Sequence, residues 1–182
     1  LAQRSRQAKN AIAILLLSQG VPILLAGDEV LNTQNGNNNG YCQNNELTWF
    51  DWRLLQTNAD MLRFARHMIA LRKRHPCLMR RRFLSGSAVN GRDIPDVSWH
   101  GIDIDAPLWN DPDAQVLAFT LAAVSDGEAD IHVMLNLSDS GIDMEVPAIH
   151  GRELRLALDT GLAAPDDIVS PEQQTSFSEK RY

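Results

Sequence analysis

The spacing of apolar positions changes twice within the first third of the chain. Residues 2–18 carry apolar side chains at helical intervals, and Gly20 then supplies a usual C-terminal stop, so a helix is predicted here. The next seven residues, VPILLAG (21–27), are apolar without alternation. Such a run is typical of a strand buried on both faces in a parallel sheet.

A second helix is predicted for the segment NADMLRFARHMIALRKRHP, residues 58–76. Its apolar stripe consists of Met61, Phe64, Met68 and Leu71. Asn58 or Asp60 is the expected N-cap, and Pro76 ends the helix. One strand with two helices cannot bury both strand faces, so this part is expected to belong to a larger barrel or sheet.

The pattern changes to short runs from Val97 onward. These runs are VSWHG, VLAFTLAAV, DIHVMLNLS, MEVP and RELRLALDT. Several alternate apolar with polar residues, and turn-rich pieces such as Ser125-Asp126-Gly127 separate them. We therefore predict an antiparallel β-sandwich for residues 97–182, joined to residues 1–84 by a connector at residues 85–96.

Between the predicted strand and the second helix lies the segment GNNNGYCQNNELTWFDW, residues 36–52. The pairs Asn35-Gly36 and Asn39-Gly40 favour tight turns, so this segment is expected to be a loop. Its amides can hydrogen-bond hydroxyl groups and its rings can stack on apolar faces, which suits a sugar better than a phosphate. A surface loop that binds nothing is the open alternative.

Charge divides the chain into two parts. Residues 1–100 hold 13 Lys and Arg against 7 Asp and Glu, whereas residues 101–182 hold 4 against 16, which implies two domains. The basic run at residues 72–74 lies where a helix would end, and cations there favour the helix dipole. We therefore predict no nucleic-acid partner. The basic helix end facing the acidic second half is the structural alternative.

Other features of the sequence narrow the classes of protein. The longest apolar stretch is too short and too broken to span a bilayer, so no membrane segment is predicted. Two cysteines make no disulfide framework, which favours the cytoplasm, although one Cys42–Cys77 bridge stays open. His67 and His75 are too far apart on the helix to share a metal, and no phosphate loop or dinucleotide fingerprint is present, so no metal or cofactor is expected.

Residues 15–52, LLLSQGVPILLAGDEVLNTQNGNNNGYCQNNELTWFDW, closely resemble the last barrel strand and following loop of glycogen-debranching enzymes and isoamylases of the α-amylase superfamily. FARHMIALRKRHPCL resembles their final barrel helix, and GRDIPDVSWHG the entry to their C-terminal β-domain. The resemblance implies α/β plus all-β architecture: the end of a (β/α)8 barrel, with residues 21–27 as its eighth strand, followed by an antiparallel β-sandwich. It also implies an α-1,6-glucan hydrolase acting on glycogen or limit dextrin.

In such a barrel the active site is built by loops at the carboxyl ends of the strands, where residues 28–52 would lie. The expected substrate-binding residues are Asp28, Glu29, Asn37, Asn38, Asn39, Tyr41, Gln43 and Asn44. Trp49 and Trp52 are assigned an anchoring role against the barrel, with sugar stacking as the alternative.

Asp28 and Glu29 are not expected to be a catalytic pair. Retaining glycosidases need two carboxyls about 5 to 5.5 Å apart, whereas neighbours on an extended strand point to opposite sides. The resemblance assigns the three catalytic carboxylates to earlier strands. The first residue is Leu1 and the first methionine is Met61, so we expect the chain to be a fragment. The resemblance then implies that it contributes no catalytic residue and is inactive alone.

Two other function classes stay open, namely a carbohydrate-binding module and a purely structural β-domain. A further expectation concerns association. Without barrel neighbours, the segment 21–27 leaves apolar surface exposed, so the chain should self-associate or pack its two helices over that strand.

Overall fold

The computed structural model describes residues 2–89, 91–92, 94–125 and 127–182. The predicted connector therefore includes two residues outside the described ranges, Asn90 and Asp93, and the predicted turn Ser125-Asp126-Gly127 includes another, Asp126. The chain forms two compact units. The first comprises Leu1–Arg72 and Ala157–Gln174, and the second comprises Lys73–Leu156 and Thr175–Tyr182.

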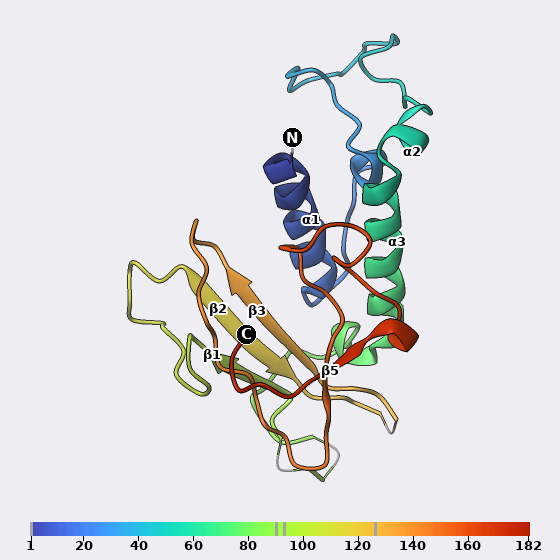
Figure 1. Ribbon diagram of the computed structural model, residues 1–182. Coiled ribbons are helices and arrows are strands. Elements are labelled where there is room, and N and C mark those ends of the chain that lie inside the picture. Colours follow the sequence, from blue (N-terminus) through green and yellow to red (C-terminus); the bar gives the residue numbers. More distant parts are fainter. Residues whose placement is uncertain (1, 90, 93, 126) are drawn as a thin grey trace. The chain divides into compact units, whose positions relative to one another are not determined.

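The first unit is built around the helices α1 (Ala2–Leu17) and α3 (Ala59–Arg74) (Figure 1). The last two residues of α3 belong to the second unit. Shorter helical turns are η1 (Asp28–Val30), α2 (Leu54–Thr57) and η3 (Pro171–Gln173). Both predicted helices are confirmed. Gly20 follows α1 with a φ of 92°, a left-handed conformation that glycine adopts without strain, as the predicted stop requires.

The core of the first unit lies on one side of each helix. The predicted stripe of α3 is buried: Met61, Phe64, Met68 and Leu71. The buried apolar side chains of α1 are Ile12, Ala13, Leu16 and Leu17. These positions recur at three- and four-residue intervals, so each helix keeps a continuous apolar face away from water.

Arg72 ends the buried stripe of α3 and caps the other helix. Its guanidinium donates to the carbonyl oxygens of Leu16 (2.6 Å), Ser18 (2.7 Å) and Gly20 (2.5 Å). The last carbonyls of a helix have no partner within the helix, so these bonds satisfy the end of α1. Burial lowers the pKa of Arg72.

The strand predicted for residues 21–27 is wrong for the chain as described. The segment is extended but pairs with no other segment among the described residues, and Val21, Ile23 and Leu25 are 89%, 85% and 67% exposed. A strand requires neighbours to complete its hydrogen bonds, and no such neighbour lies beside this segment in the described chain. The two helices do not cover the side chains of Val21, Ile23 and Leu25. The alternative in which the helices pack over this segment is therefore wrong.

The second unit contains two antiparallel sheets. Strands β1 (Val97–His100), β2 (Val116–Leu121) and β3 (Ile131–Asn136) form one sheet in the order β1-β2-β3. Strands β4 (Leu154–Leu156) and β5 (Thr175–Phe177) form the other, and a short turn η2 (Pro76–Leu78) follows α3. The predicted antiparallel pairing is confirmed, whereas the barrel and the sandwich stay predictions.

Not every predicted run became a strand. The run MEVP forms an isolated bridge, Glu145 to Arg181, rather than a strand. Backbone bonds join Met144 to Tyr182 in both directions (2.9 Å), and the Val146 N–H donates to the Lys180 carbonyl at 3.0 Å. Buried carboxylates instead hold the loops of the second unit. Asp96 accepts from the backbone N–H groups of Ser85 and Gly86 and from Arg80, and these donors hold its pKa below the ordinary value despite burial.

The two cysteines and the apolar content of the helices bear on two expectations from composition. Cys42 is exposed and Cys77 is buried, and neither is in a disulfide, so the open alternative of a Cys42–Cys77 bridge is wrong. Among the described residues, no helix has the length and apolar content of a membrane span.

Candidate functional site

The asparagine-rich loop connects η1 to α2 and contains no helix or strand. Its first predicted reversal is confirmed, because Asn35 and Gly36 have φ values of 52° and 87°, as a tight turn requires. The second reversal depends on a side chain: Asn39 Oδ1 accepts from the Tyr41 backbone N–H at 3.1 Å. A Cβ on Gly40 would lie 2.7 Å from Thr48 Cγ2, so this close approach needs glycine.

The carboxamide oxygens of the loop are used largely within it. Asn37 Oδ1 accepts from the Asn39 N–H at 2.8 Å, and Asn44 Oδ1 accepts from the Trp49 indole N–H at 2.9 Å. The Nδ2 groups of Asn37, Asn39 and Asn44 donate to no other residue that the structure describes. The exposed Asn38 adds a further amide. The loop therefore presents mainly N–H donors to a ligand.

The remaining polar candidates are Asp28 and Glu29, which precede the loop, and Gln43 near its centre. Asp28 is exposed on η1, and Glu29 Oε2 turns back to accept from the Gly27 N–H at 2.8 Å. Gln43 donates through Nε2 to the Asn39 carbonyl at 3.4 Å. No bond in the described chain joins the side chains of Asp28 or Glu29 to the loop amides, so the eight predicted residues do not form one cluster.

The aromatic residues of the loop are exposed. Tyr41 is 83% exposed and Trp52 is 72% exposed, with Phe50 edge-on to Trp52 at a centroid distance of 4.7 Å. Trp49 is also exposed, and its indole N–H ties it to Asn44 rather than to a core. Neither indole is buried in the described chain, and the predicted anchoring of both tryptophans against a barrel stays a prediction. Three ring faces stay available to a ligand.

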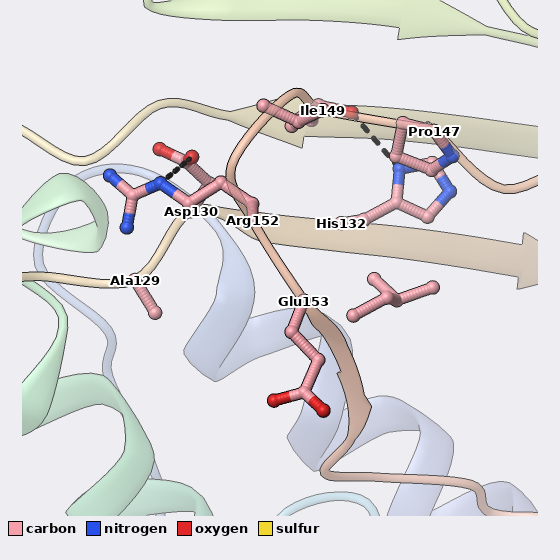
Figure 2. Close-up of a pocket in the computed structure, with 9 residues that line it drawn as sticks. Ala129, Asp130, His132, Pro147, Ile149, Arg152 and Glu153 are labelled. Carbon is pink, nitrogen blue, oxygen red and sulfur yellow. Dashed lines mark hydrogen bonds and ion pairs between the residues drawn. The ribbon is translucent and has the colours of Figure 1, made fainter. Parts of the chain in front are cut away.

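A pocket of about 100 Å³ lies in the second unit (Figure 2). It is lined by Thr120, Ala129, Asp130, His132, Pro147, Ile149, Arg152, Glu153 and Leu154. Asp130 is held by Arg92 through two bonds of 2.6 and 3.2 Å and lies 3.5 Å from Arg152 Nε. These cations and the Ala123 N–H hold its pKa below the ordinary value, although burial acts in the opposite direction.

A row of hydrogen bonds runs across the sheet behind this pocket. The Thr120 hydroxyl lies 3.0 Å from both His100 Nε2 and His132 Nδ1. Because His100 Nδ1 accepts from the Asp105 backbone N–H at 2.9 Å, His100 carries its proton on Nε2 and donates it to Thr120. Thr120 then donates to His132 Nδ1, which leaves the His132 proton on Nε2.

Burial keeps both histidines of this row neutral. It lowers the pKa of His100, and it lowers that of His132 to about 4, with a smaller contribution from His100. Sequence analysis missed these residues. Thr120 and His132 lie opposite each other on neighbouring strands. This pairing register cannot be read from the sequence, so alternation within each strand did not show that the two side chains share a face.

The described residues contain no group of three or more His, Cys, Asp and Glu side chains arranged to hold a metal ion. The candidate binding residues within the loop, Asn37, Asn38, Asn39, Tyr41, Gln43 and Asn44, offer amides and an aromatic ring. Such groups hydrogen-bond hydroxyls and stack on apolar ring faces, but they supply no nucleophile or proton-transfer group of their own.

Comparison with known proteins finds one matching family and several named relatives. Residues 98–182 match the family described as "Isoamylase 1-3, C-terminal". The glycogen operon protein GlgX homolog of Mycobacterium tuberculosis is 49% identical over 100 residues, covering 54% of this chain and 14% of that protein. Isoamylase 3, chloroplastic, of Oryza sativa subsp. japonica is 36% identical over 171 residues, covering 93% of this chain and 20% of that protein.

A solved structure agrees with these relatives. The pullulanase from Paenibacillus barengoltzii, in complex with maltohexaose and alpha-cyclodextrin, superposes with a TM-score of 0.64 at 27% identity, covering 84% of this chain and 21% of that one. The chain is thus similar to isoamylases, in agreement with the sequence resemblance, and residues 98–182 match the isoamylase C-terminal domain family. It spans about a fifth or less of the length of these relatives.

Proposed function

We propose that the chain is the C-terminal part of a glycogen-debranching, isoamylase-like α-1,6-glucan hydrolase. Similarity to isoamylase 3 over 93% of the chain carries this proposal, because a match of that extent includes both the loop and the β-rich half. In this proposal residues 1–84 complete a (β/α)8 barrel, residues 85–96 connect, and residues 97–182 form a β-sandwich.

The partner in this proposal is an α-glucan bound by the asparagine-rich loop. Two features of the loop support it, namely the side-chain amides of the half-buried Asn37 and the exposed Asn38, Asn39 and Asn44, and the exposed rings of Tyr41, Trp49 and Trp52. Sugar hydroxyls accept from the former and apolar sugar faces cover the latter. Asp28, Glu29 and Gln43 would bind at the edge of the cleft. The catalytic carboxylates would come from strands outside this chain.

Expression of the complete reading frame that contains this chain tests the proposal. We expect the product to release linear chains from glycogen by α-1,6 cleavage. Tyr41→Ala should raise the KM for glycogen, because an exposed ring is lost from the cleft. Phe83→Ala is the matched control, since Phe83 is 98% exposed in the other unit and should leave KM unchanged.

Two outcomes of that experiment would count against the proposal. A complete product that cleaves no α-1,6 bond would overturn the assigned activity. If cleavage is normal and Tyr41→Ala equals Phe83→Ala, the loop has a structural role only. In that case the second function class, a structural element without glucan contact, describes the loop.

Two finer parts of the proposal concern the cellular compartment of the chain and its association with other copies. We place the chain in a reducing cytoplasm, which the exposed Cys42 outside any disulfide supports. We also propose that the chain self-associates through residues 21–27 when its barrel neighbours are absent. The exposed apolar side chains of Val21, Ile23 and Leu25 support this.

A further inference from the structure

The second unit exposes a cluster of aromatic rings on its three-stranded sheet. Trp99 of β1 is 39% exposed, and Trp109, in the connection between β1 and β2, is 61% exposed. Their ring centroids are 5.5 Å apart with planes at 71°, so the edge of one ring meets the face of the other. Phe119, the partner of Trp99 across the sheet, lies 5.6 Å behind it at 57°.

The connection between β1 and β2 is built to bring Trp109 back to Trp99. The chain folds back immediately after β1, at the buried Gly101. A Cβ there would lie 2.5 Å from the Ala106 carbonyl oxygen and 3.0 Å from Leu108 Cγ. Only glycine allows this approach, and Trp109 follows Leu108 directly. The position of Trp109 is therefore fixed by close backbone packing.

Exposing two indoles in this way is costly for a domain. A tryptophan can bury 150–250 Å² and usually contributes strongly to a core or an interface. Here Trp99 meets the ring of Trp109 and is itself in contact with Phe119, while Trp109 stays 61% exposed to the solvent. The arrangement is a rigid aromatic platform, and rigid platforms lose little conformational entropy when a ligand binds.

Polar groups near the platform are acceptors, and the whole half of the chain is acidic. Exposed Asn110, Asp111 and Asp113 follow Trp109 directly, and Asp111 Oδ1 accepts from the Asp113 N–H at 2.9 Å. Residues 101–182 hold 16 Asp and Glu against 4 Lys and Arg. This charge disfavours phosphates and nucleic acids, which need cations. A neutral ligand with apolar faces and many hydroxyl donors fits both features.

We propose that Trp99 and Trp109 form a second α-glucan contact, separate from the asparagine-rich loop. The outer face of Trp109 stacks on a glucose ring, and Asn110 and Asp113 accept hydrogen bonds from its hydroxyls. The choice of ligand rests on the proposed glucan function, although the platform itself needs no catalysis. Its use would be to hold a long glucan chain on the β-rich half.

Titration of the ¹⁵N-labelled chain with maltohexaose tests this site directly. The chain has four tryptophans, so the indole N–H signals of Trp99 and Trp109 can be followed separately from those of Trp49 and Trp52. We expect the Trp109 signal, and with it the Trp99 signal, to move saturably at millimolar sugar. Trp109→Ala should weaken glycogen binding about tenfold, the equivalent of about 1.4 kcal/mol.

Two matched variants show whether the loss of binding is specific to the ring at position 109. Trp109→Phe preserves a ring and should retain most of the binding, whereas Phe83→Ala removes a 98% exposed ring elsewhere in the same unit and should change nothing. A second, folding-independent readout is the Trp99 signal in Trp109→Ala, which should stay dispersed but no longer respond to sugar.

Three results would overturn the proposal. The Trp99 and Trp109 signals could stay fixed while those of Trp49 and Trp52 move, which leaves only the loop as a glucan contact. All four indole signals could stay fixed while the complete enzyme cleaves glycogen. That result would exclude glucan binding by Trp99 and Trp109 and leave the proposed function intact. The indole signals could instead shift with protein concentration alone, which would identify a second copy of the chain as the occupant.

Discussion

Arg72 shows how one side chain can hold two helices in register. Its guanidinium is almost wholly buried, and three carbonyl oxygens beyond or within the last turn of α1 accept from it. Charged donors make stronger hydrogen bonds than neutral ones, and the acceptors are also buried or partly buried. The sequence related the basic run at residues 72–74 to the dipole of its own helix or to the acidic second half, so this contact was missed.

Replacement of Arg72 tests its role in the first unit. We expect Arg72→Met to lower the free energy of unfolding by about 2 kcal/mol or more, because the carbonyls of Leu16, Ser18 and Gly20 lose their charged donor. Urea unfolding followed by circular dichroism measures this. Arg66→Met, on the exposed face of the same helix, is the control, and equal losses from both would contradict the role.

At the scale of elements, the helices were predictable and the strand at residues 21–27 was not. The apolar stripe of α3 lies within one segment, so Met61, Phe64, Met68 and Leu71 reveal it unaided. A strand instead depends on partners that its own sequence does not contain. The same limit applies to the site: the turns at Asn35 and Asn39 were readable, but the inward bond of Trp49 to Asn44 was not.

The three-stranded sheet should lose stability in mild acid. His100 and His132 have lowered pKa values in the folded chain, His132 about 4, against about 6.5 for histidine in an unfolded chain. The unfolded state then binds more protons between these values, so stability is complete above about pH 6.5 and falls as the pH approaches 4. The low-pKa carboxylates Asp96 and Asp130 add losses at lower pH.

Thermal unfolding across that pH range measures the effect. His132→Asn should flatten the profile between pH 6.5 and 4, because the group that must be protonated on unfolding is gone. His150→Asn removes an exposed histidine of the same unit and should leave the profile unchanged. A wild-type profile that is already flat in this interval would show that neither buried histidine resists protonation.

At the scale of the whole molecule, the chain carries a loop and a β-rich half but no assigned catalytic carboxylate. We therefore expect the chain alone to release no reducing ends from glycogen, measured with protein free of host glucosidases. Addition of active enzyme to the same sample checks that the substrate is competent. Measurable α-1,6 cleavage by the chain itself would mean that residues such as Asp28 and Glu29 act as catalysts after all.

The exposed segment 21–27 gives a second prediction at this scale. Val21, Ile23 and Leu25 leave apolar area in water, and burial of such area is worth about 25 cal/mol per Å². We expect the light-scattering mass of the chain to rise with concentration and Ile23→Lys to reduce that rise. Phe83→Lys, at another highly exposed site, is the control. A mass that stays monomeric at all concentrations would refute this.

The late position of Asp167 in the sequence affects how the first unit can fold during synthesis. Asp167 is fully buried in the first unit, where Lys9 Nζ lies 2.5 Å away and Arg63 also pairs with it. Both cations leave the ribosome long before Asp167 does. The first unit therefore cannot complete this cluster of charges until Asp167, 104 residues after Arg63, has also been synthesised. Until then its helices carry two cations without their buried partner.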